Sequence, residues 1–205
     1  KTLVGSDSHT PTCGAMGMIA IGAGGLDVAV AMATGTYYLQ CPSVVRVNLV
    51  GKKAKWASAK DVILYILQQL SVKGGVNKII EYTGEGLKEL SLTDRATICN
   101  MGAELGATTS VFPTDEITKE YLIQQGREED YVELKADEDA TYDEEITVDL
   151  SKLVPLTAKP HSPDAVVPVS ELRGMKINQV VIGSCTNSSL PDMLKAAKIL
   201  KGRRV

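Results

Sequence analysis

The chain alternates short, β-branched apolar runs with segments that carry helix-start patterns, and this alternation limits its fold more than any other feature. Residues 44–50 (VVRVNLV) and 79–82 (IIEY) have the composition of strands. Between them, Ser58 and Asp61 form an S-x-x-D capping box that begins a helix with its apolar residues on one face. Because helices recur between strands, we predict an α/β fold with an at least partly parallel sheet.

The same patterns place further elements along the chain. The remaining predicted elements are a strand at the start, helices over residues 96–107, 115–125 and from a second S-x-x-D box at 189–192, and strands over residues 145–150 and 177–183. Thr10 followed by Pro11 predicts another helix start. The four prolines of residues 155–168 predict an extended crossing loop, and the acidic stretch 127–145 predicts a solvated surface near a domain boundary.

The composition excludes several classes of protein. Hydrophobic residues make up 44% and charged residues 23% of the 205 residues, as in folded globular proteins rather than disordered ones. A net charge of -3 gives no overall attraction for nucleic acid or an anionic membrane, and no apolar run is long enough to span a bilayer. The four cysteines are far apart, so we expect reduced thiols in the cytoplasm, or in a mitochondrial matrix if the source is eukaryotic.

The ends of the chain fall inside predicted elements. The first residues, KTLVG, are predicted to form a strand, and the final residues, GRRV, are predicted to begin another. We therefore expect the chain to be a piece of a longer protein, because complete domains rarely begin or finish within an element.

The glycine-rich residues 22–27 do not form a dinucleotide-binding motif. Gly22 and Gly24 are present, but Asp27 stands where G-x-G-x-x-G requires its last glycine. The segment also follows a helical pattern rather than a strand, which excludes a Rossmann-type site here.

The first candidate site is the sequence SDSH, residues 6–9. In an extended segment Asp7 and His9 would point to the same side, so that a carboxylate and an imidazole face one ligand. Together they could hold and protonate an oxygen atom. Ser8 would lie near helix N-terminal amides, which suit a substrate carboxylate. The alternative from these residues alone is that they only cap the following helix.

The second candidate is on the predicted helix 96–107. Asn100 and Glu104 are four residues apart and therefore share one face. The neighbouring residues are mostly small or apolar, so Glu104 either faces solvent or enters a polar cavity. Solvent is the preferred local interpretation, because a buried glutamate is rare unless it is paired.

The third candidate is the sequence VIGSCTNSS, residues 181–189. A strand, a loop and a capped helix would place Cys185 at the carboxyl end of a strand, where open α/β sheets bind their ligands. Backbone amides and the helix N-terminus would favour its thiolate, the form that binds metal. The flanking hydroxyl and amide side chains are poor core residues, which weighs against a buried cysteine. Simple packing is the preferred interpretation for Cys13, Cys41 and Cys99.

Three stretches of the chain resemble motifs of the aconitase family of iron-sulfur hydro-lyases, in the family's order. They are GSDSHTPTCGAMGMIAIGAGGLDVA, ATICNMGAELGATTSVFP and VIGSCTNSS. The resemblance implies aconitase-type three-layer α/β/α domains, with this chain covering parts of adjacent ones. Residues 1–42 would end a first domain, residues 43–145 would form a second, and residues 146–205 would begin a third that carries the cysteine loop.

The resemblance also implies a [4Fe-4S] cluster held by three cysteines, with one iron open to the substrate. Cys185 matches the first of these ligands. The other two belong to a C-x-x-C pair further along, so only one of the three ligands is expected in this chain. Asn100 matches a position beside the cluster.

The substrate contacts follow from the same resemblance. Asp7 and His9 match residues that hydrogen-bond the hydroxyl or water on the open iron. Ser8 matches a residue that binds a substrate carboxylate, and Glu104 matches another acid near that oxygen. The implied partners are a small tricarboxylic or dicarboxylic acid and the remainder of the parent chain. That remainder would include a swivelling domain with the catalytic serine and most of the arginines.

The choice of substrate rests on short stretches. GSDSHTPT and SVKGG are more similar to aconitate hydratase, which predicts interconversion of citrate and isocitrate through cis-aconitate, a reaction of the tricarboxylic acid cycle. The alternative within the family is the large subunit of an isopropylmalate or homoaconitate isomerase. An alternative of another class is a regulatory aconitase that binds RNA, for which the chain shows no basic stripe with interleaved aromatics. We expect the chain alone to be inactive, because most of the implied site lies elsewhere.

Overall fold

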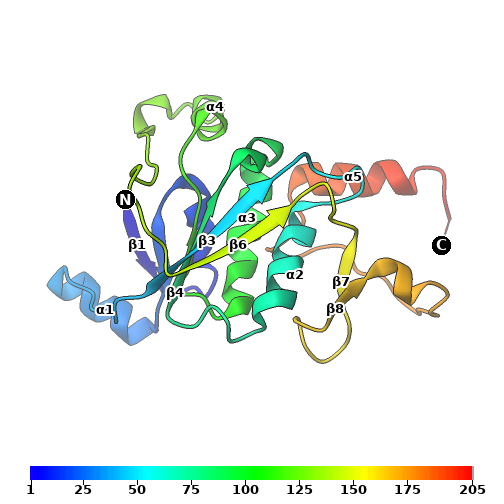
Figure 1. Cartoon of the computed structure of the whole chain (residues 1–205), viewed down its shortest axis with the longest axis horizontal. Helices are drawn as coiled ribbons and strands as arrows, with labels where there is room; N and C mark the ends of the chain where they lie inside the picture. Colours follow the sequence, from blue (N-terminus) through cyan, green and yellow to red (C-terminus); the bar gives the residue numbers. More distant parts are fainter. Residues whose placement is uncertain (205) are drawn as a thin grey trace.

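The computed structural model describes residues 1–204, and a parallel four-stranded sheet forms its centre (Figure 1). The strand order is β5-β4-β3-β6, and every neighbouring pair is parallel. The strands are β3 (Ser43–Val50), β4 (Lys78–Thr83), β5 (Thr109–Val111) and β6 (Glu144–Asp149). The predicted α/β class with a parallel sheet is therefore confirmed.

Alternation along the strands gives the sheet one buried and one polar face. Val47 is fully buried and lies opposite Tyr82 on β4 and Ile146 on β6. Arg46, the next residue back, points to the other face and pairs with Glu145 across 2.7 Å. Because the side-chain period of a strand is two, this register sends the apolar residues of all three strands to the same core.

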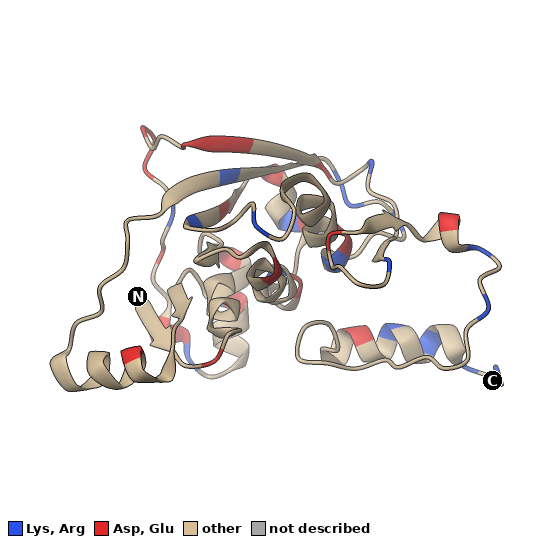
Figure 2. Cartoon of the chain, turned by 90° about the horizontal axis from the view of Figure 1, so that it is seen from below, with Lys and Arg blue, Asp and Glu red and all other residues tan. Residues whose placement is uncertain are grey.

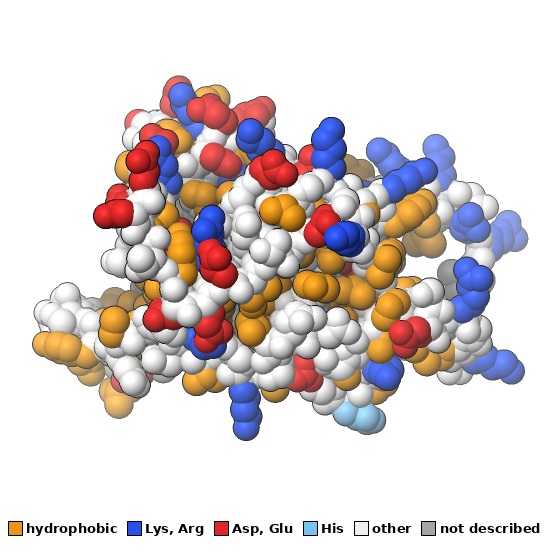
Figure 3. Space-filling view, viewed as in Figure 1, with side chains coloured by type: hydrophobic (Ala, Val, Ile, Leu, Met, Phe, Trp, Pro, Cys, Tyr) orange, Lys and Arg blue, Asp and Glu red, His pale blue; other side chains and the backbone are white. Residues whose placement is uncertain are grey.

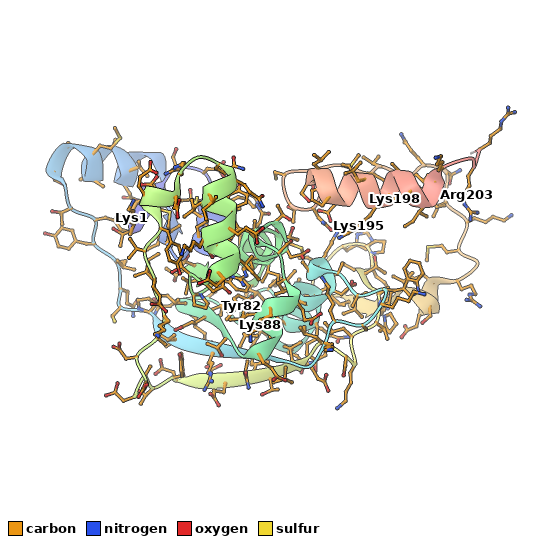
Figure 4. The ribbon with its side chains drawn as sticks, turned by 90° about the horizontal axis from the view of Figure 1, so that it is seen from above. Lys1, Tyr82, Lys88, Lys195, Lys198 and Arg203 are labelled. Atoms are coloured by element: carbon orange, nitrogen blue, oxygen red, sulfur yellow. The ribbon has the colours of Figure 1, made fainter. Side chains whose placement is uncertain are left out.

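Two helices cover the buried face. They are α2 (Ala59–Leu70) and α3 (Leu92–Met101), which also contact each other (Figure 1). Each begins at a capping box, from Ser58 to Asp61 for α2 and from Ser91 to Asp94 for α3. Tyr82 of β4 lies in the interior (Figure 4) and stacks on the equally buried Phe112, with ring centroids 4.4 Å apart. The core is otherwise aliphatic, as the low aromatic share of 4% requires.

The first residues form a second, smaller sheet beside β5. Strands β1 (Thr2–Gly5) and β2 (Ile19–Gly22) are parallel and are joined by the 3-10 helix η1 (Thr10–Met16). The Thr109 hydroxyl of β5 donates to the Ala20 carbonyl of β2 at 2.6 Å. Close approach also fixes this packing, because a Cβ atom on Gly14 would lie 1.7 Å from the Ser110 carbonyl oxygen. Only glycine is compatible with that contact.

The remaining elements lie around this core. They are α1 (Gly25–Thr34), α4 (Glu116–Gln124), α5 (Leu190–Leu200), the antiparallel strands β7 (Leu156–Ala158) and β8 (Val166–Pro168), and the 3-10 helices η2 (Glu85–Glu89), η3 (Gly102–Leu105), η4 (Glu128–Asp130) and η5 (Val169–Leu172). Helices α1 and α5 have no buried residue, and they lie at the two ends of the molecule (Figure 1). The acidic stretch after α4 is mostly exposed, and acidic side chains gather over this part of the surface (Figure 3). The predicted solvated surface is confirmed.

Four local predictions differ from the structure. The helix predicted over residues 96–107 begins at Leu92, because the Ser91 capping box precedes it, and it passes into η3 after Met101. The helix start at Thr10 is a 3-10 helix capped at His9, and Thr10 donates its hydroxyl to the Asp7 carbonyl instead. The proline-rich crossing loop contains the β7–β8 hairpin.

The fourth difference concerns residues 177–183, which were predicted to be a strand. No strand forms there among residues 1–204, and Val180 and Val181 are 66% and 82% exposed. A strand requires a neighbour that pairs with its backbone amides and carbonyls. The described part of the chain places no such neighbour beside this segment.

The predicted domain boundaries remain predictions. The boundary placed between residues 145 and 146 falls within β6, which pairs with β3 from Val45 to Val50. Residues on both sides of it therefore contribute to one sheet.

Candidate active site

The SDSH segment forms a tight turn between β1 and η1, not the extended segment predicted for it. The Asp7 carboxylate accepts a hydrogen bond from the His9 amide at 2.6 Å, which is the geometry of an Asx turn. Ser8 Oγ lies 3.0 Å and Asp7 Oδ1 3.8 Å from His9 Nδ1. The His9 side chain is 33% exposed, so it reaches solvent with its ring oriented by two neighbours.

One face of α3 and the turn that follows carries the second group of candidates. Thr97, Asn100 and Glu104 follow one another at helical spacing and so share this face. Asn100 is 4% exposed and donates from Nδ2 to the Thr12 hydroxyl at 2.9 Å, and the Thr12 hydroxyl donates to the His9 carbonyl at 2.7 Å. Asn100 therefore lies behind the SDSH turn and supports it. Its Oδ1 atom is buried without a hydrogen-bond partner in the described structure.

The cysteine loop, which we define as residues 183–188, approaches the same helix. Cys185 is exposed, and the following residue, Thr186, accepts a hydrogen bond at its carbonyl from the Thr97 hydroxyl at 3.1 Å. The predicted helix start after the loop is confirmed, since α5 is capped at Ser189, whose hydroxyl donates to Asp192. The prediction that Cys185 follows a strand is wrong, because residues 177–183 are not paired.

A cavity of about 590 Å³ joins the helix face to the cysteine loop. Glu104 lines it together with Ser184 and Thr186, the two neighbours of Cys185. Glu104 is exposed, and this exposure is toward the cavity. The structure thus brings Glu104 and the cysteine loop to one side of the molecule.

The structure does not bring Ser8 into that cavity. Ser8 lines a neighbouring one of about 520 Å³, together with Ala103 and Gly106. Residues 103 and 104 are consecutive, so the turn η3 separates the two cavities. Ser8 and the cysteine loop accordingly line different cavities, each of which includes a residue of η3.

Sequence reasoning missed three residues that line the cavity with Glu104. Lys60 and Asp61 come from the first turn of α2, and Thr157 comes from β7. The capping box at Ser58 explained the local role of Asp61, and nothing in the sequence indicated that the beginning of α2 faces the cysteine loop. Lys60 supplies a positive charge of the kind that a small acidic ligand requires.

The described thiols fit an iron-sulfur cluster only in part. Cys185 is exposed and lies between two residues that line the cavity, whereas Cys99 is fully buried and its pKa is raised well above its usual value, because burial outweighs the opposing effect of Arg95. The Cys99 thiol points to the Ser110 carbonyl at 3.6 Å and does not line the cavity. Residues 1–204 bring no three potential metal ligands together. This donor set can supply one corner of a cluster, and the other cysteines would come from outside the chain.

The chain is similar to several curated proteins along nearly its whole length. It is 47% identical over 202 residues to the 3-isopropylmalate dehydratase large subunit 2 of Archaeoglobus fulgidus, covering 98% of this chain and 49% of that protein. It is 48% identical to the 3-isopropylmalate dehydratase large subunit of Caldicellulosiruptor saccharolyticus, covering 99% and 47%. The corresponding protein of Lachnoclostridium phytofermentans is 42% identical, covering 100% and 48%. The chain thus spans about half the length of these relatives.

These relatives overturn the prediction of aconitate hydratase. Proteins 42% to 48% identical over nearly all of the chain are named for isopropylmalate and not for citrate. The stretches GSDSHTPT and SVKGG did not discriminate between the two. Neither stretch has a demonstrated contact with the group by which the two substrates differ.

The sequence profile of one family matches residues 1–174, and its description is "Aconitase family (aconitate hydratase)". That range contains β1 to β8, the SDSH turn and the face of α3 that carries Thr97 and Asn100. Because the profile covers more than half of the chain and the relatives agree along the rest, the family is established. The chain belongs to the aconitase family.

Proposed function

We propose that this chain is part of the large subunit of an isopropylmalate dehydratase, a hydro-lyase that removes water from isopropylmalate and adds it back. The observation that carries the proposal is the shared cavity, which Glu104 lines together with both neighbours of Cys185. An acid on a cavity whose wall includes both neighbours of an exposed thiol provides two of the groups that a metal-assisted dehydration needs. The names of the relatives supply the substrate class.

We assign the other roles in the dehydration to polar residues of this chain. Asp7 and His9 hydrogen-bond the departing hydroxyl, and the Asx turn with Ser8 fixes the imidazole for this purpose. Glu104 is the acid in the cavity next to the cysteine loop. Ser8 receives a substrate carboxylate at the beginning of η1. Asn100 does not touch the substrate in this assignment and instead supports His9 through Thr12.

The family cofactor, a [4Fe-4S] cluster, would be held in part by Cys185. When bound, it supplies a Lewis acid that draws electron density from the leaving hydroxyl. The role of this chain is to present one thiolate on an exposed loop and to keep acids near the open position. The remaining cysteines, a catalytic base and further cations belong to the rest of the enzyme.

The complete enzyme would require a second polypeptide. The relatives are named large subunits, so a small subunit is the partner that we propose, in place of a swivelling domain within one long chain. It would bring the missing polar groups over the cavity.

Among the helices of residues 1–204, none combines the length and the hydrophobicity that a membrane span requires.

The proposal is tested on the complete large subunit together with its small subunit. Formation of the unsaturated acid from 3-isopropylmalate and from citrate is followed by ultraviolet absorbance. We expect turnover of isopropylmalate, and we expect Cys185→Ser to reduce it at least about 100-fold. Cys41→Ser changes an equally exposed thiol outside the cavity and should leave the rate unchanged. Turnover of citrate alone, or full activity of Cys185→Ser, would contradict the proposal. The 205-residue chain by itself should form no unsaturated acid from either substrate.

A further inference from the structure

The hydroxyl of Thr97 joins α3 to the cysteine loop. Thr97 is 4% exposed, and its Oγ1 donates to the carbonyl of Thr186, the residue directly after Cys185, at 3.1 Å. The same hydroxyl lies 3.2 Å from the Thr93 carbonyl one turn earlier in the helix. A helical threonine ordinarily back-bonds within its own helix, so the reach to residue 186 is the unusual part.

The other hydrogen bonds of the cysteine loop are internal or lead to α5. The Ser184 amide donates to the Ser188 hydroxyl, the Thr186 amide donates to the Ser184 hydroxyl, and the Asn187 side chain donates to Asp192. In the part of the chain that the structure describes, no further hydrogen bond ties residues 183–188 to the rest of the fold. Since α5 has no buried residue, it gives the loop little support.

The helix at the other end of this bond is firmly held. Arg95 on α3 is fully buried, and its guanidinium donates two hydrogen bonds to Asp115, at 2.9 and 2.6 Å, and one to the Leu87 carbonyl at 3.2 Å. Thr97 therefore connects an exposed loop to a helix that is held by buried hydrogen bonds. The same helix face supports the SDSH turn through Asn100 and ends at Glu104.

We propose that Thr97 is a positioning residue that fixes the Thr186 carbonyl and thereby keeps the Cys185 thiol at the cavity lined by Glu104. The inference deepens the proposed function, on which its catalytic meaning rests. Together with Asn100, it makes one face of α3 the common support of the acid–imidazole turn and the metal-binding thiol. The two groups would then keep their separation when the rest of the enzyme assembles over them.

The direct test is hydrogen–deuterium exchange of the chain, with millisecond labelling of the amides of residues 184–188. Thr97→Val has nearly the same shape but lacks the hydroxyl. We expect it to raise the exchange rate of these amides about threefold to tenfold, since one hydrogen bond changes the opening equilibrium by that factor. Thr97→Ser keeps the hydroxyl and should stay within twofold of the unchanged protein. If Thr97→Val does not fold, Thr97→Ala also removes the hydroxyl and should give the same response.

Thr109→Val is the matched control. Thr109 is also buried and also donates its hydroxyl to a carbonyl 89 residues away, but that carbonyl belongs to Ala20. Thr109→Val should raise the hydrogen-exchange rate of the β2 amides and leave that of the cysteine loop unchanged. An unchanged loop in both Thr97→Val and Thr97→Ala, or an equal effect of Thr109→Val on the loop, would overturn the inference.

A second measurement separates this inference from the proposed function. In the complete enzyme with its small subunit, the visible absorbance of the cluster is followed during exposure to air. Thr97→Val should shorten its lifetime at least threefold, and Thr97→Ser should restore it. If the unchanged enzyme holds a cluster but does not dehydrate isopropylmalate, the proposed function fails while the loop result stands. If Thr97→Val keeps the lifetime of the unchanged enzyme, the positioning role fails while the function stands.

Discussion

Arg95 and Asp115 form the most consequential pair of single residues outside the site. The guanidinium is fully buried, packs 5.6 Å from the centre of the Phe112 ring and makes a bidentate contact with Asp115. The same carboxylate caps α4 by accepting from the amides of Ile117 and Thr118. A charge buried this deeply is tolerated only with such a partner.

The Asp115 side chain should make the free energy of unfolding depend on pH in the acidic range. Burial raises the pKa of this carboxyl, but the hydrogen bonds and charge of Arg95 and the amides of Thr118 and Ile117 outweigh it and lower the pKa. A carboxyl with a lowered pKa in the folded state stabilises the protein above its unfolded pKa of about 3.9. This contribution is lost as the pH falls through the folded value.

We predict that Asp115→Asn lowers the free energy of unfolding by about 2 kcal/mol at pH 7. The figure is below that of a fully buried pair, because the Asp115 side chain is 33% exposed. Asparagine retains the helix cap, so the loss reports the ion pair. In urea titrations from pH 7 to pH 3 the difference from the unchanged protein should shrink below pH 4. Asp130→Asn, which breaks an exposed pair with Arg127, should have no measurable effect at pH 7. A difference that stays constant with pH would refute this account.

At the scale of elements, the capping boxes that begin α2 and α3 have the same sequence pattern but different tertiary contacts. Asp61 accepts from the amide and hydroxyl of Ser58, and its second oxygen accepts from the Leu156 amide of β7 at 2.6 Å. Asp94 accepts from the amide and hydroxyl of Ser91 and lies 3.6 Å from the Lys53 ammonium, but it accepts no hydrogen bond from a strand. Asp61 therefore both starts α2 and attaches the β7–β8 hairpin beside the cavity.

This difference predicts unequal costs for the same substitution. Asp94→Ala should cost about 1 kcal/mol, the usual value of a lost helix cap. Asp61→Ala should cost about 2 to 3 kcal/mol, because it also leaves the Leu156 amide without its partner. Chemical denaturation of both variants provides the comparison, and the exchange of the Leu156 amide should increase only in Asp61→Ala. Equal costs would show that the contact with β7 does not contribute.

At the scale of the whole molecule, apolar surface is concentrated at the two ends. Leu26 and Met32 of α1 are 78% and 83% exposed, and Val181 before α5 is 82% exposed. The chain from Arg173 onward and α5 also carry basic residues, including Lys195, Lys198 and Arg203 (Figures 2 and 4). The central sheet and its two helices, by contrast, hold a continuous core.

This distribution predicts that the last residues are dispensable for folding. A chain ending at Gly174 should unfold cooperatively, with a midpoint within about 2 °C of the longer chain, because α5 buries no residue. Its fluorescence with the dye ANS should fall at least by half, since exposed apolar side chains are removed. A chain ending at Tyr142 serves as the control and should not fold, because it lacks β6 and the buried Val148. Loss of cooperative unfolding in the chain that ends at Gly174 would contradict this prediction.

The sequence by itself determined the α/β class, the central strands and helix starts such as Ser58 and Ser189, because these depend on side-chain alternation and on hydrogen bonds within a few residues. It also determined the family, since the three motifs are long. It did not determine the substrate, because the short stretches used for that choice did not distinguish aconitate hydratase from the isopropylmalate dehydratases that the chain is similar to. Tertiary structure decided that residues 177–183 are unpaired, that Asp61 and Lys60 share a cavity with Glu104, and that Thr97 bonds to Thr186. These outcomes depend on contacts between residues up to 95 positions apart, which no local pattern encodes.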